Sequence, residues 1–310
     1  MDGTDDSDID ADVFERAEAG TAPEPQQRWV NLPPAGMLSL EDADALLRWR
    51  EASLVAVVGE RNGGKTTLIT ELYERFLRGP FGGHDFAHSL SLLGFERKSF
   101  QSRAESGEEI PDTPRTSKQD GLSFFHLALA DAAESRRTDL LVSERAGEVY
   151  REVRDRPAGA PDLIEVRKAR IVSFVVDGER VADHRRRAEA LASVRNIARA
   201  FADSGAIPAA AELQIVTTKC DLLRNEAGEA ARAALAHFEE RFAAQYSGRF
   251  ASVSTHRTAA RDPSGIVEAG EGLEPLLRSW LIPRARAAPV PPPMPELADE
   301  FDRLLLRRVA

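Results

Sequence analysis

The sequence predicts a three-layer α/β fold, with helices on both faces of a mostly parallel sheet of about six strands and one antiparallel edge strand. Two observations predict this class. Short apolar runs recur along the chain, and their nearly continuous apolar character is typical of parallel strands that are covered on both faces. Segments with the apolar spacing of helices separate most of these runs, and such alternation indicates a parallel sheet with crossover helices.

The first expected strand is SLVAVVG, at residues 53–59. Five further candidates follow at 122–130, 138–144, 170–177, 213–219 and 249–255. Only a short charged connector separates the run FFHLALA from the run TDLLVSE, so we expect these two strands to form a hairpin. This hairpin supplies the antiparallel strand at the edge of the sheet.

The first expected helix follows Ser39, which is suited to cap a helix because Asp42 lies three residues further on. A second helix is expected in KTTLITELYERFL, directly after the first strand. Further helical patterns cover 183–202, 226–245 and 272–281.

The domain organisation is one large domain with flanking segments. We expect a disordered acidic tail at 1–26, a single domain at 27–282 with a long irregular insertion at about 79–119, a proline-rich linker at 283–295 and an amphipathic helix at 296–310. The insertion is expected to be irregular because it is rich in Gly, Ser, Pro and charged residues.

Composition excludes several classes of protein. A formal net charge of −10 argues against a nucleic-acid-binding protein, because phosphate backbones are bound by basic surfaces. The chain contains 1 cysteine and therefore no internal disulfide. The start of the chain is acidic and lacks the apolar segment of a secretory signal. No apolar run approaches the ~18 residues that a membrane helix needs. We expect a cytoplasmic protein.

The segment GERNGGKT after the first strand has the pattern G-x-x-x-x-G-K-T. A glycine-rich loop between a strand and a helix presents backbone N–H groups and the positive end of the helix to a phosphate. Lys65 is expected to reach the β- and γ-phosphates, and the Thr66 hydroxyl to coordinate Mg²⁺. The expected phosphate-binding residues are Gly59, Asn62, Gly63, Gly64, Lys65, Thr66 and Thr67.

The segment Thr218-Lys219-Cys220-Asp221 ends the fifth expected strand, where a loop can reach the base of a nucleotide bound across the sheet. An aspartate carboxylate accepts two hydrogen bonds from guanine, and adenine lacks that pair of donors. We expect Asp221 to bind guanine and the aliphatic part of Lys219 to lie along the base. Ser254 occupies the place of a second base-contacting loop after the sixth strand.

Together with these two motifs, the segment LLVSERAGE resembles the Ras-like, TRAFAC-class GTPases, over roughly residues 50–282. Within that class, the segments LYERFLRGPFGG, FAHSLSLLGFE and TPRTSKQDGLSFFHLAL resemble the bacterial double-GTPase-type domains of predicted conflict or signalling systems. The resemblance implies a Ras-like P-loop fold, binding of GTP and GDP with Mg²⁺, and switching between the two nucleotides.

This chain departs from the D-x-x-G pattern of the family, because Glu144 stands in place of the aspartate. Glu144 keeps the charge and can contact Mg²⁺ through water, and Gly147 keeps the glycine whose N–H meets the γ-phosphate. Glu148 replaces the glutamine that orients water in many relatives. Its carboxylate either acts on the attacking water or is repelled by the γ-phosphate, and it can also serve simply as an acidic residue at a helix start.

The family also needs a threonine that coordinates Mg²⁺ when the γ-phosphate is present. Thr116 is our choice, and Thr113 is the second candidate. Arg115 is expected either to act as an arginine finger in cis or to be a solvated loop residue.

These motifs favour a GTP-binding switch that hydrolyses GTP slowly and signals to a protein effector or regulator. Two alternatives stay open: a nucleotide-dependent binding module that does not hydrolyse GTP, and an ATPase. Dimerisation that depends on nucleotide is a further possibility for this class of protein.

Overall fold

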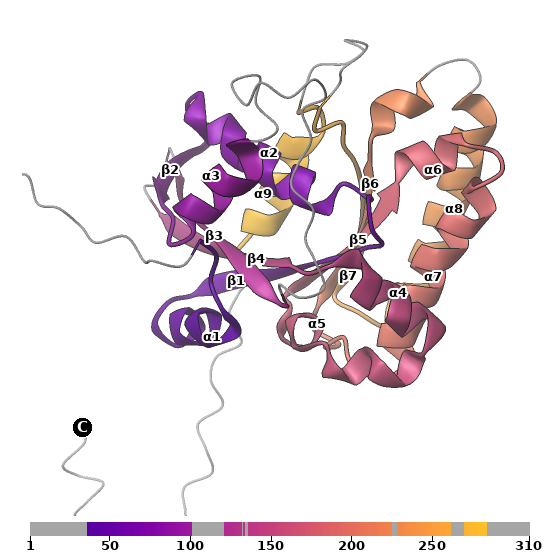
Figure 1. Ribbon diagram of the computed structural model, residues 1–310, viewed down its shortest axis with the longest axis horizontal. Coiled ribbons are helices and arrows are strands. Elements are labelled where there is room, and N and C mark those ends of the chain that lie inside the picture. The colour runs from indigo at the N-terminus through magenta and orange to yellow at the C-terminus, as the bar shows by residue number, and fades with distance from the viewer. Residues whose placement is uncertain are drawn as a thin grey trace, which may run out of the picture. The chain divides into compact units, whose positions relative to one another are not determined.

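A computed structural model describes residues 36–283, except for 101–120, 132, 134–135, 225–227 and 262–269. It contains a seven-stranded sheet in the order β2-β3-β4-β1-β5-β6-β7 (Figure 1). The strands are β1 (Ala52–Val58), β2 (His84–His88), β3 (Ser123–Asp131), β4 (Arg137–Glu144), β5 (Ile171–Asp177), β6 (Glu212–Thr218) and β7 (Ser252–Arg257). The predicted three-layer, mostly parallel α/β fold is confirmed.

Helices cover both faces of the sheet (Figure 1). One face carries α2 (Lys65–Leu77), α3 (Leu92–Phe100) and α9 (Leu273–Leu281). The other carries α1 (Leu40–Trp49), α4 (Gly147–Asp155), α5 (Ile164–Lys168), α7 (Arg187–Asp203) and α8 (Glu229–Tyr246). Shorter helices are α6 (Gly178–Ala182) and the 3₁₀ turns η3 (Pro157–Asp162) and η4 (Cys220–Leu223).

The central strand β1 shows why its sequence is continuously apolar. Leu54, Ala56 and Val58 point into the core under α4 and α7. Val55 and Val57 point into the core under α2 and α9. Because successive side chains in a strand alternate between faces, a strand buried on both faces needs apolar residues at every position.

The expected hairpin is confirmed, since β3 runs antiparallel to β4 along the whole length of the pair, but the edge strand is β2 and not β3. Strand β4 pairs in parallel with β1, and β1, β5, β6 and β7 continue the sheet in parallel. The carboxyl ends of β1, β4, β5 and β6 therefore meet at one edge of the sheet, and this edge collects the loops that carry the sequence motifs.

The expectation of an irregular segment at about 79–119 is wrong for its first part, because β2 and α3 lie there. Strand β2 pairs antiparallel with β3 at the edge of the sheet, and its middle residues are exposed, so it has no apolar run to reveal it. Helix α3 contains Gly94, which disfavours a helix in isolation. A Cβ at Gly94 would lie 1.9 Å from the carbonyl oxygen of Gly36, so this close contact requires glycine.

Helix α1 begins as the sequence predicts. The Ser39 hydroxyl accepts a hydrogen bond of 3.1 Å from the Asp42 backbone N–H, and the Asp42 carboxylate accepts one of 2.9 Å from the Ser39 N–H. Other boundaries differ: α7 begins at Arg187, not at 183, and β7 begins at Ser252, not at 249. The acidic tail, most of the proline-rich linker and the C-terminal helix expected at 296–310 lie outside the described residues.

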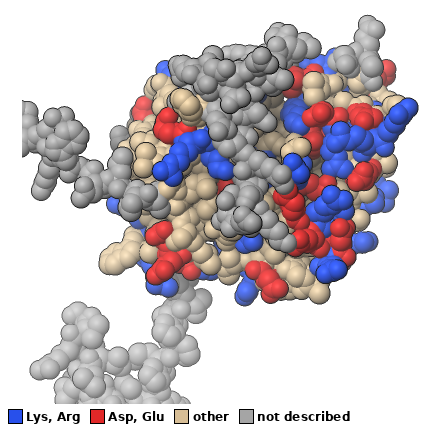
Figure 2. Space-filling view, viewed as in Figure 1, with Lys and Arg blue, Asp and Glu red and all other residues tan. Residues whose placement is uncertain are grey.

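The surface carries both charges. On the face shown in Figure 2, acidic and basic side chains are interspersed where α4, α6, α7 and α8 lie in Figure 1. None of the helices in the described part of the chain is long and apolar enough to cross a membrane.

Candidate functional site

The glycine-rich loop lies between β1 and α2, which is the strand–loop–helix context that the sequence predicts. Gly64 precedes α2 with φ +82°, and Asn62 also has a positive φ of 62°. This left-handed conformation favours glycine at position 64. The expected phosphate-binding residues Gly59, Asn62, Gly63, Gly64, Lys65, Thr66 and Thr67 all lie in this loop or in the first turn of α2.

Lys65 is buried at the start of α2, with 8% of its surface exposed. Its Nζ donates hydrogen bonds to the carbonyl oxygens of Gly59 at 2.9 Å and Glu60 at 3.0 Å. Burial lowers the pKa of Lys65, and the charges of Glu144 and Glu148 partly oppose this effect. A buried ammonium group bonded to neutral carbonyls gains strongly when an anionic oxygen replaces them, so this arrangement fits a phosphate.

Thr66 and Glu144 meet at the carboxyl end of β4. Thr66 Oγ1 donates a 2.6 Å hydrogen bond to Glu144 Oε1, and 1% of Glu144 is exposed. A hydroxyl oxygen beside a carboxylate is a suitable pair of hard ligands for Mg²⁺, which usually takes one or two protein ligands and completes its shell with phosphates and water. The described residues include no group of three or more His, Cys, Asp and Glu side chains that could hold a metal ion by themselves.

Gly147 begins α4 and contacts the phosphate-binding loop directly. A Cβ added to Gly147 would lie 2.2 Å from the backbone nitrogen of Arg61 and 2.4 Å from the carbonyl carbon of Glu60. Glu148 lies in the first turn of α4, where an acidic residue is favourable, and its carboxylate is 3.9 Å from Arg61. The structure therefore brings the E-R-A-G segment against the loop.

The T-K-C-D segment is attached to the same loop. Thr218 Oγ1 donates a 2.8 Å hydrogen bond to the carbonyl oxygen of Gly63. Lys219 Nζ donates one of 3.0 Å to the carbonyl oxygen of Asn62. Two segments that lie far apart in the sequence, and that are expected to contact the phosphates and the base, are thus joined directly.

Two acidic residues at the end of β5 and directly after it hold Lys219. Its Nζ lies 3.1 Å from Asp177 Oδ1 and 2.7 Å from Glu179 Oε2. Burial alone lowers the pKa of Lys219, but the hydrogen bond to Glu179 and the charge of Asp177 outweigh burial and raise it. Neither acidic residue is predicted from the sequence, although the end of a parallel strand next to the loop was a signal for them.

Asp221 is buried, with 5% exposed, at the start of η4. It lines a pocket of about 200 Å³ together with Cys220 and Ala259. Burial raises the pKa of the Cys220 thiol to about 12, which agrees with a filler residue and not a nucleophile.

The structure does not bring Ser254 to this site. Ser254 lies in the middle of β7, level with Gln214 of β6. The expectation placed the strand end too early, because β7 extends to Arg257. The residue that meets the T-K-C-D segment is Thr258, whose carbonyl oxygen accepts a 3.1 Å hydrogen bond from the Cys220 N–H.

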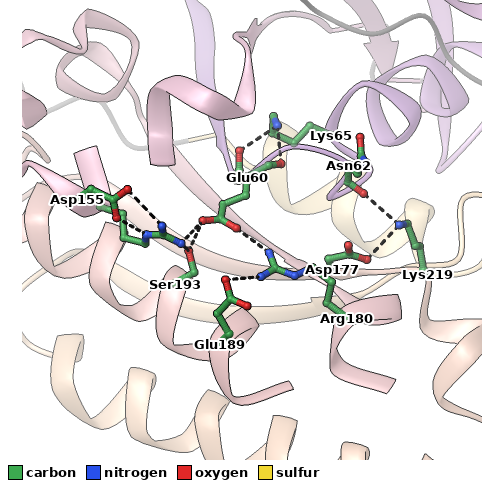
Figure 3. A network of polar contacts seen from close by, with 11 residues as sticks. Glu60, Asn62, Lys65, Asp155, Asp177, Arg180, Glu189, Ser193 and Lys219 are labelled. Atoms are coloured by element: carbon green, nitrogen blue, oxygen red, sulfur yellow. Dashed lines mark hydrogen bonds and ion pairs between the residues drawn. The ribbon is translucent and has the colours of Figure 1, made fainter. Parts of the chain in front are cut away.

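Arg115 and Thr116, and the alternative Thr113, lie outside the described residues. A polar cluster around Glu60 of the loop was also not predicted: the Glu60 carboxylate joins Arg154 of α4 to Arg180 of α6 (Figure 3).

The family model named Double-GTPase 2 matches residues 53–281, which is more than half of the chain. The chain belongs to the Double-GTPase 2 family. Its P-loop domain is accordingly a Ras-like, GTP-binding domain, as the resemblance in the sequence implied. No curated protein matches the chain.

Several solved structures resemble this Double-GTPase 2 chain. One is the signal recognition particle receptor SRb-GTP/SRX complex from Chaetomium thermophilum, with 14% identity over 74% of this chain and 96% of that chain, and a TM-score of 0.41. Another is an ADP-ribosylation-factor-like GTP-binding protein, or small COPII coat GTPase SAR1, from Encephalitozoon cuniculi in complex with GDP. It has 13% identity over 74% of this chain and 77% of that chain, and a TM-score of 0.33. A third is the GTPase-like domain of Ski7 from S. cerevisiae, bound to GDP and inorganic phosphate. It has 12% identity over 76% of this chain and 51% of that chain, and a TM-score of 0.41.

Proposed function

We propose that this domain binds Mg²⁺–GTP, hydrolyses it slowly to GDP and signals the difference to a protein effector or regulator. The observation that supports this most is the direct attachment of the T-K-C-D segment to the phosphate-binding loop through Thr218 and Lys219. A nucleotide held at its phosphates and at its base would contact both segments, so their fixed spacing favours one nucleotide-sized ligand.

Three residues carry nucleotide binding in this proposal. Lys65 exchanges its carbonyl partners for phosphate oxygens. Asp221 accepts hydrogen bonds from guanine, and Lys219, two residues before it, positions its aliphatic chain beside the base.

Thr66 would coordinate Mg²⁺ directly and Glu144 would contact it through water, with Thr116 or Thr113 as a further ligand. The ion supplies charge neutralisation at the β- and γ-phosphates when it is bound.

Hydrolysis is expected to be slow. Glu148 places a carboxylate in the first turn of α4, beside Arg61 of the loop, and Gly147 offers its N–H to the γ-phosphate. A negative charge near the γ-phosphate opposes binding of the triphosphate unless the carboxylate acts as a base on the attacking water. Arg115 would accelerate the reaction if it acts as an arginine finger.

The second candidate is a nucleotide-dependent binding module that does not hydrolyse GTP, and it is favoured by Glu144 and Glu148, which stand in place of the usual aspartate and glutamine. An ATPase is the weaker alternative. The acidic composition and the single cysteine favour a cytoplasmic location, and a nucleotide-dependent dimer would supply catalytic groups that one copy lacks.

Titration calorimetry with GDP and GTPγS against ADP and ATPγS, in Mg²⁺, tests the proposal on the wild type and on Asp221→Asn. We expect the wild type to prefer guanine nucleotides. The variant should lose about 10- to 100-fold of that preference, because hydrogen bonds to a charged group contribute about 1.5–3 kcal/mol. Asp203→Asn is the matched control, since Asp203 is largely exposed and pairs with Arg249 at the surface. Equal binding of adenine and guanine nucleotides by the wild type would overturn the proposal.

A further inference from the structure

Glu60, the first residue after Gly59 in the phosphate-binding loop, directs its carboxylate away from Lys65 and into a cluster of polar side chains (Figure 3). Its Oε1 lies 2.6 Å from Arg154 Nη1, and its Oε2 lies 2.6 Å from Arg180 Nη1. The Ser193 hydroxyl of α7 donates a further hydrogen bond of 2.7 Å to Oε1. Together, the two carboxylate oxygens are therefore bonded to groups from three helices: Oε1 to α4 and α7, and Oε2 to α6.

The cluster is mostly shielded from water. The side chains of Glu60, Arg154 and Arg180 are 15%, 16% and 12% exposed. Burial raises the pKa of Glu60, but hydrogen bonds from Ser193 and Arg180 and the charges of both guanidinium groups outweigh burial and lower it. Glu60 is thus ionised at neutral pH, and removing one partner leaves a buried charge under-compensated.

Each arginine is held by a second acidic residue. Arg154 Nε donates a 2.8 Å hydrogen bond to Asp155, and Arg180 Nη2 lies 3.4 Å from Glu189. These contacts keep the guanidinium groups in place, so the position of Glu60 is set by α4 on one side and by α6 on the other.

Glu60 is also bonded on its other side. Its backbone carbonyl oxygen accepts a 3.0 Å hydrogen bond from Lys65 Nζ. One residue therefore connects the lysine that is expected to bind phosphate to the arginines of two helices. A shift of either helix would move the carbonyl group that faces Lys65.

The two helices differ in what else they touch. Helix α4 begins at Gly147, which packs against the backbone of Glu60 and Arg61 and is the expected γ-phosphate contact. Helix α6 follows β5 and carries Glu179, which holds Lys219 on the base side of the site. The ion pair of Glu60 with Arg154 therefore connects the loop to the helix that carries the expected γ-phosphate contact. The ion pair of Glu60 with Arg180 connects the loop to a helix on the base side.

We propose that Arg154 is a positioning residue that sets the preference between GTP and GDP, because its ion pair with Glu60 holds the start of α4 against the phosphate-binding loop. Arg180 fixes the same carboxylate for both nucleotides alike. This inference rests on the proposed function, since it concerns the same nucleotide site.

Calorimetry with GDP and GTPγS on Arg154→Gln, and on Arg180→Gln as the matched control, tests it. We expect Arg154→Gln to lower the affinity for GTPγS about tenfold more than the affinity for GDP, which is the size of a typical coupling between two sites. Arg180→Gln should lower the affinities for GTPγS and for GDP by the same factor. The double variant Glu60→Gln/Arg154→Gln should show the same ratio of affinities as Arg154→Gln alone, because Arg154 acts through Glu60.

Thermal unfolding of each variant shows whether it folds, and Arg154→Lys, which keeps the charge, replaces Arg154→Gln if that variant does not. Equal weakening of both nucleotides by the Arg154 and Arg180 variants would overturn the inference while leaving the proposed function intact. A wild type that binds neither nucleotide would overturn the proposed function, and the inference with it.

Discussion

The hydroxyl of Thr66, in the first turn of α2, donates a 2.6 Å hydrogen bond to Oε1 of Glu144, the last residue of β4. The two residues are 78 positions apart in the chain. Their contact joins the end of the glycine-rich loop to the E-R-A-G segment, and it places a hydroxyl oxygen beside a carboxylate at the point where Mg²⁺ is proposed to bind.

Glu144→Gln keeps the size of this side chain and removes its charge. We expect the variant to lose about tenfold of the increase in GDP affinity that Mg²⁺ provides, because a water-mediated contact to the ion is weakened. Calorimetry with Mg²⁺ and with EDTA measures the increase. Glu144→Asp, which keeps the charge, should retain more of it. An unchanged Mg²⁺ effect in Glu144→Gln would show that this carboxylate does not contact the ion.

Thr218→Val should destabilise the fold by about 1 kcal/mol, the usual net contribution of one hydrogen bond, because the Gly63 carbonyl loses its donor at 2.8 Å and the longer contact of 3.3 Å to the Val176 carbonyl is lost with it. Thr217→Val is a matched control: Thr217 is buried beside it, and its hydroxyl has no hydrogen-bond partner within the described residues. Urea unfolding should therefore show a loss only for Thr218→Val. Similar losses in both variants would mean that the hydrogen bond to the loop contributes nothing.

Glu148→Gln supplies the amide that orients water in many relatives, and it should accelerate single-turnover GTP hydrolysis about fivefold, the factor that corresponds to about 1 kcal/mol, the interaction of two charges about 4 Å apart in water. Rapid-quench measurement of bound GTP gives the rate. Glu152→Gln, on the same helix, is the control and should leave the rate unchanged. A slower rate in Glu148→Gln would instead identify the carboxylate as a base.

Because the carboxylate of Asp139 is buried, we expect the free energy of unfolding to depend on pH in the acidic range. Burial raises its pKa, but hydrogen bonds from His126 and Arg137 and their charges outweigh burial and hold the pKa well below its usual range. A lowered pKa in the folded state gives stability that is present above the unfolded pKa of about 4 and is lost as the pH falls below it.

Asp139→Asn should therefore cost about 3 kcal/mol at pH 7, the lower end for a broken buried ion pair, and should lose less stability than the wild type between pH 4 and 2. Urea unfolding across this range measures both effects. Asp44→Asn is the control, since Asp44 pairs with Lys168 near the surface. Parallel pH profiles for the wild type and Asp139→Asn would contradict the prediction.

The elements that the sequence predicts well are those whose pattern is local. The apolar run of β1 and the glycine-rich loop before Lys65 are read from neighbouring residues, and the capping pair Ser39 and Asp42 lies within a single turn. The elements that it misses lack such a pattern. Strand β2 is short and exposed at the sheet edge, and α3 contains a glycine that only its contact with Gly36 explains.

The residues of the candidate site likewise divide into those that a local sequence motif predicts and those that it does not. Lys65, Thr66 and the T-K-C-D segment follow from motifs, and the structure places them on adjoining loops. Ser254 was misplaced because a strand end cannot be read to within a few residues from an alternating pattern.

The sequence by itself determined that a glycine-rich loop joins a buried strand to a helix and that a T-K-C-D segment ends a later strand, because each pattern is contained in a few consecutive residues. Only the tertiary structure decided which side chains meet. Glu60 lies 94 residues from Arg154 and 120 from Arg180 along the chain, and their contacts arise because parallel strands bring the helices that follow them to one edge of the sheet. No local period encodes such contacts, since they depend on how the whole sheet is ordered.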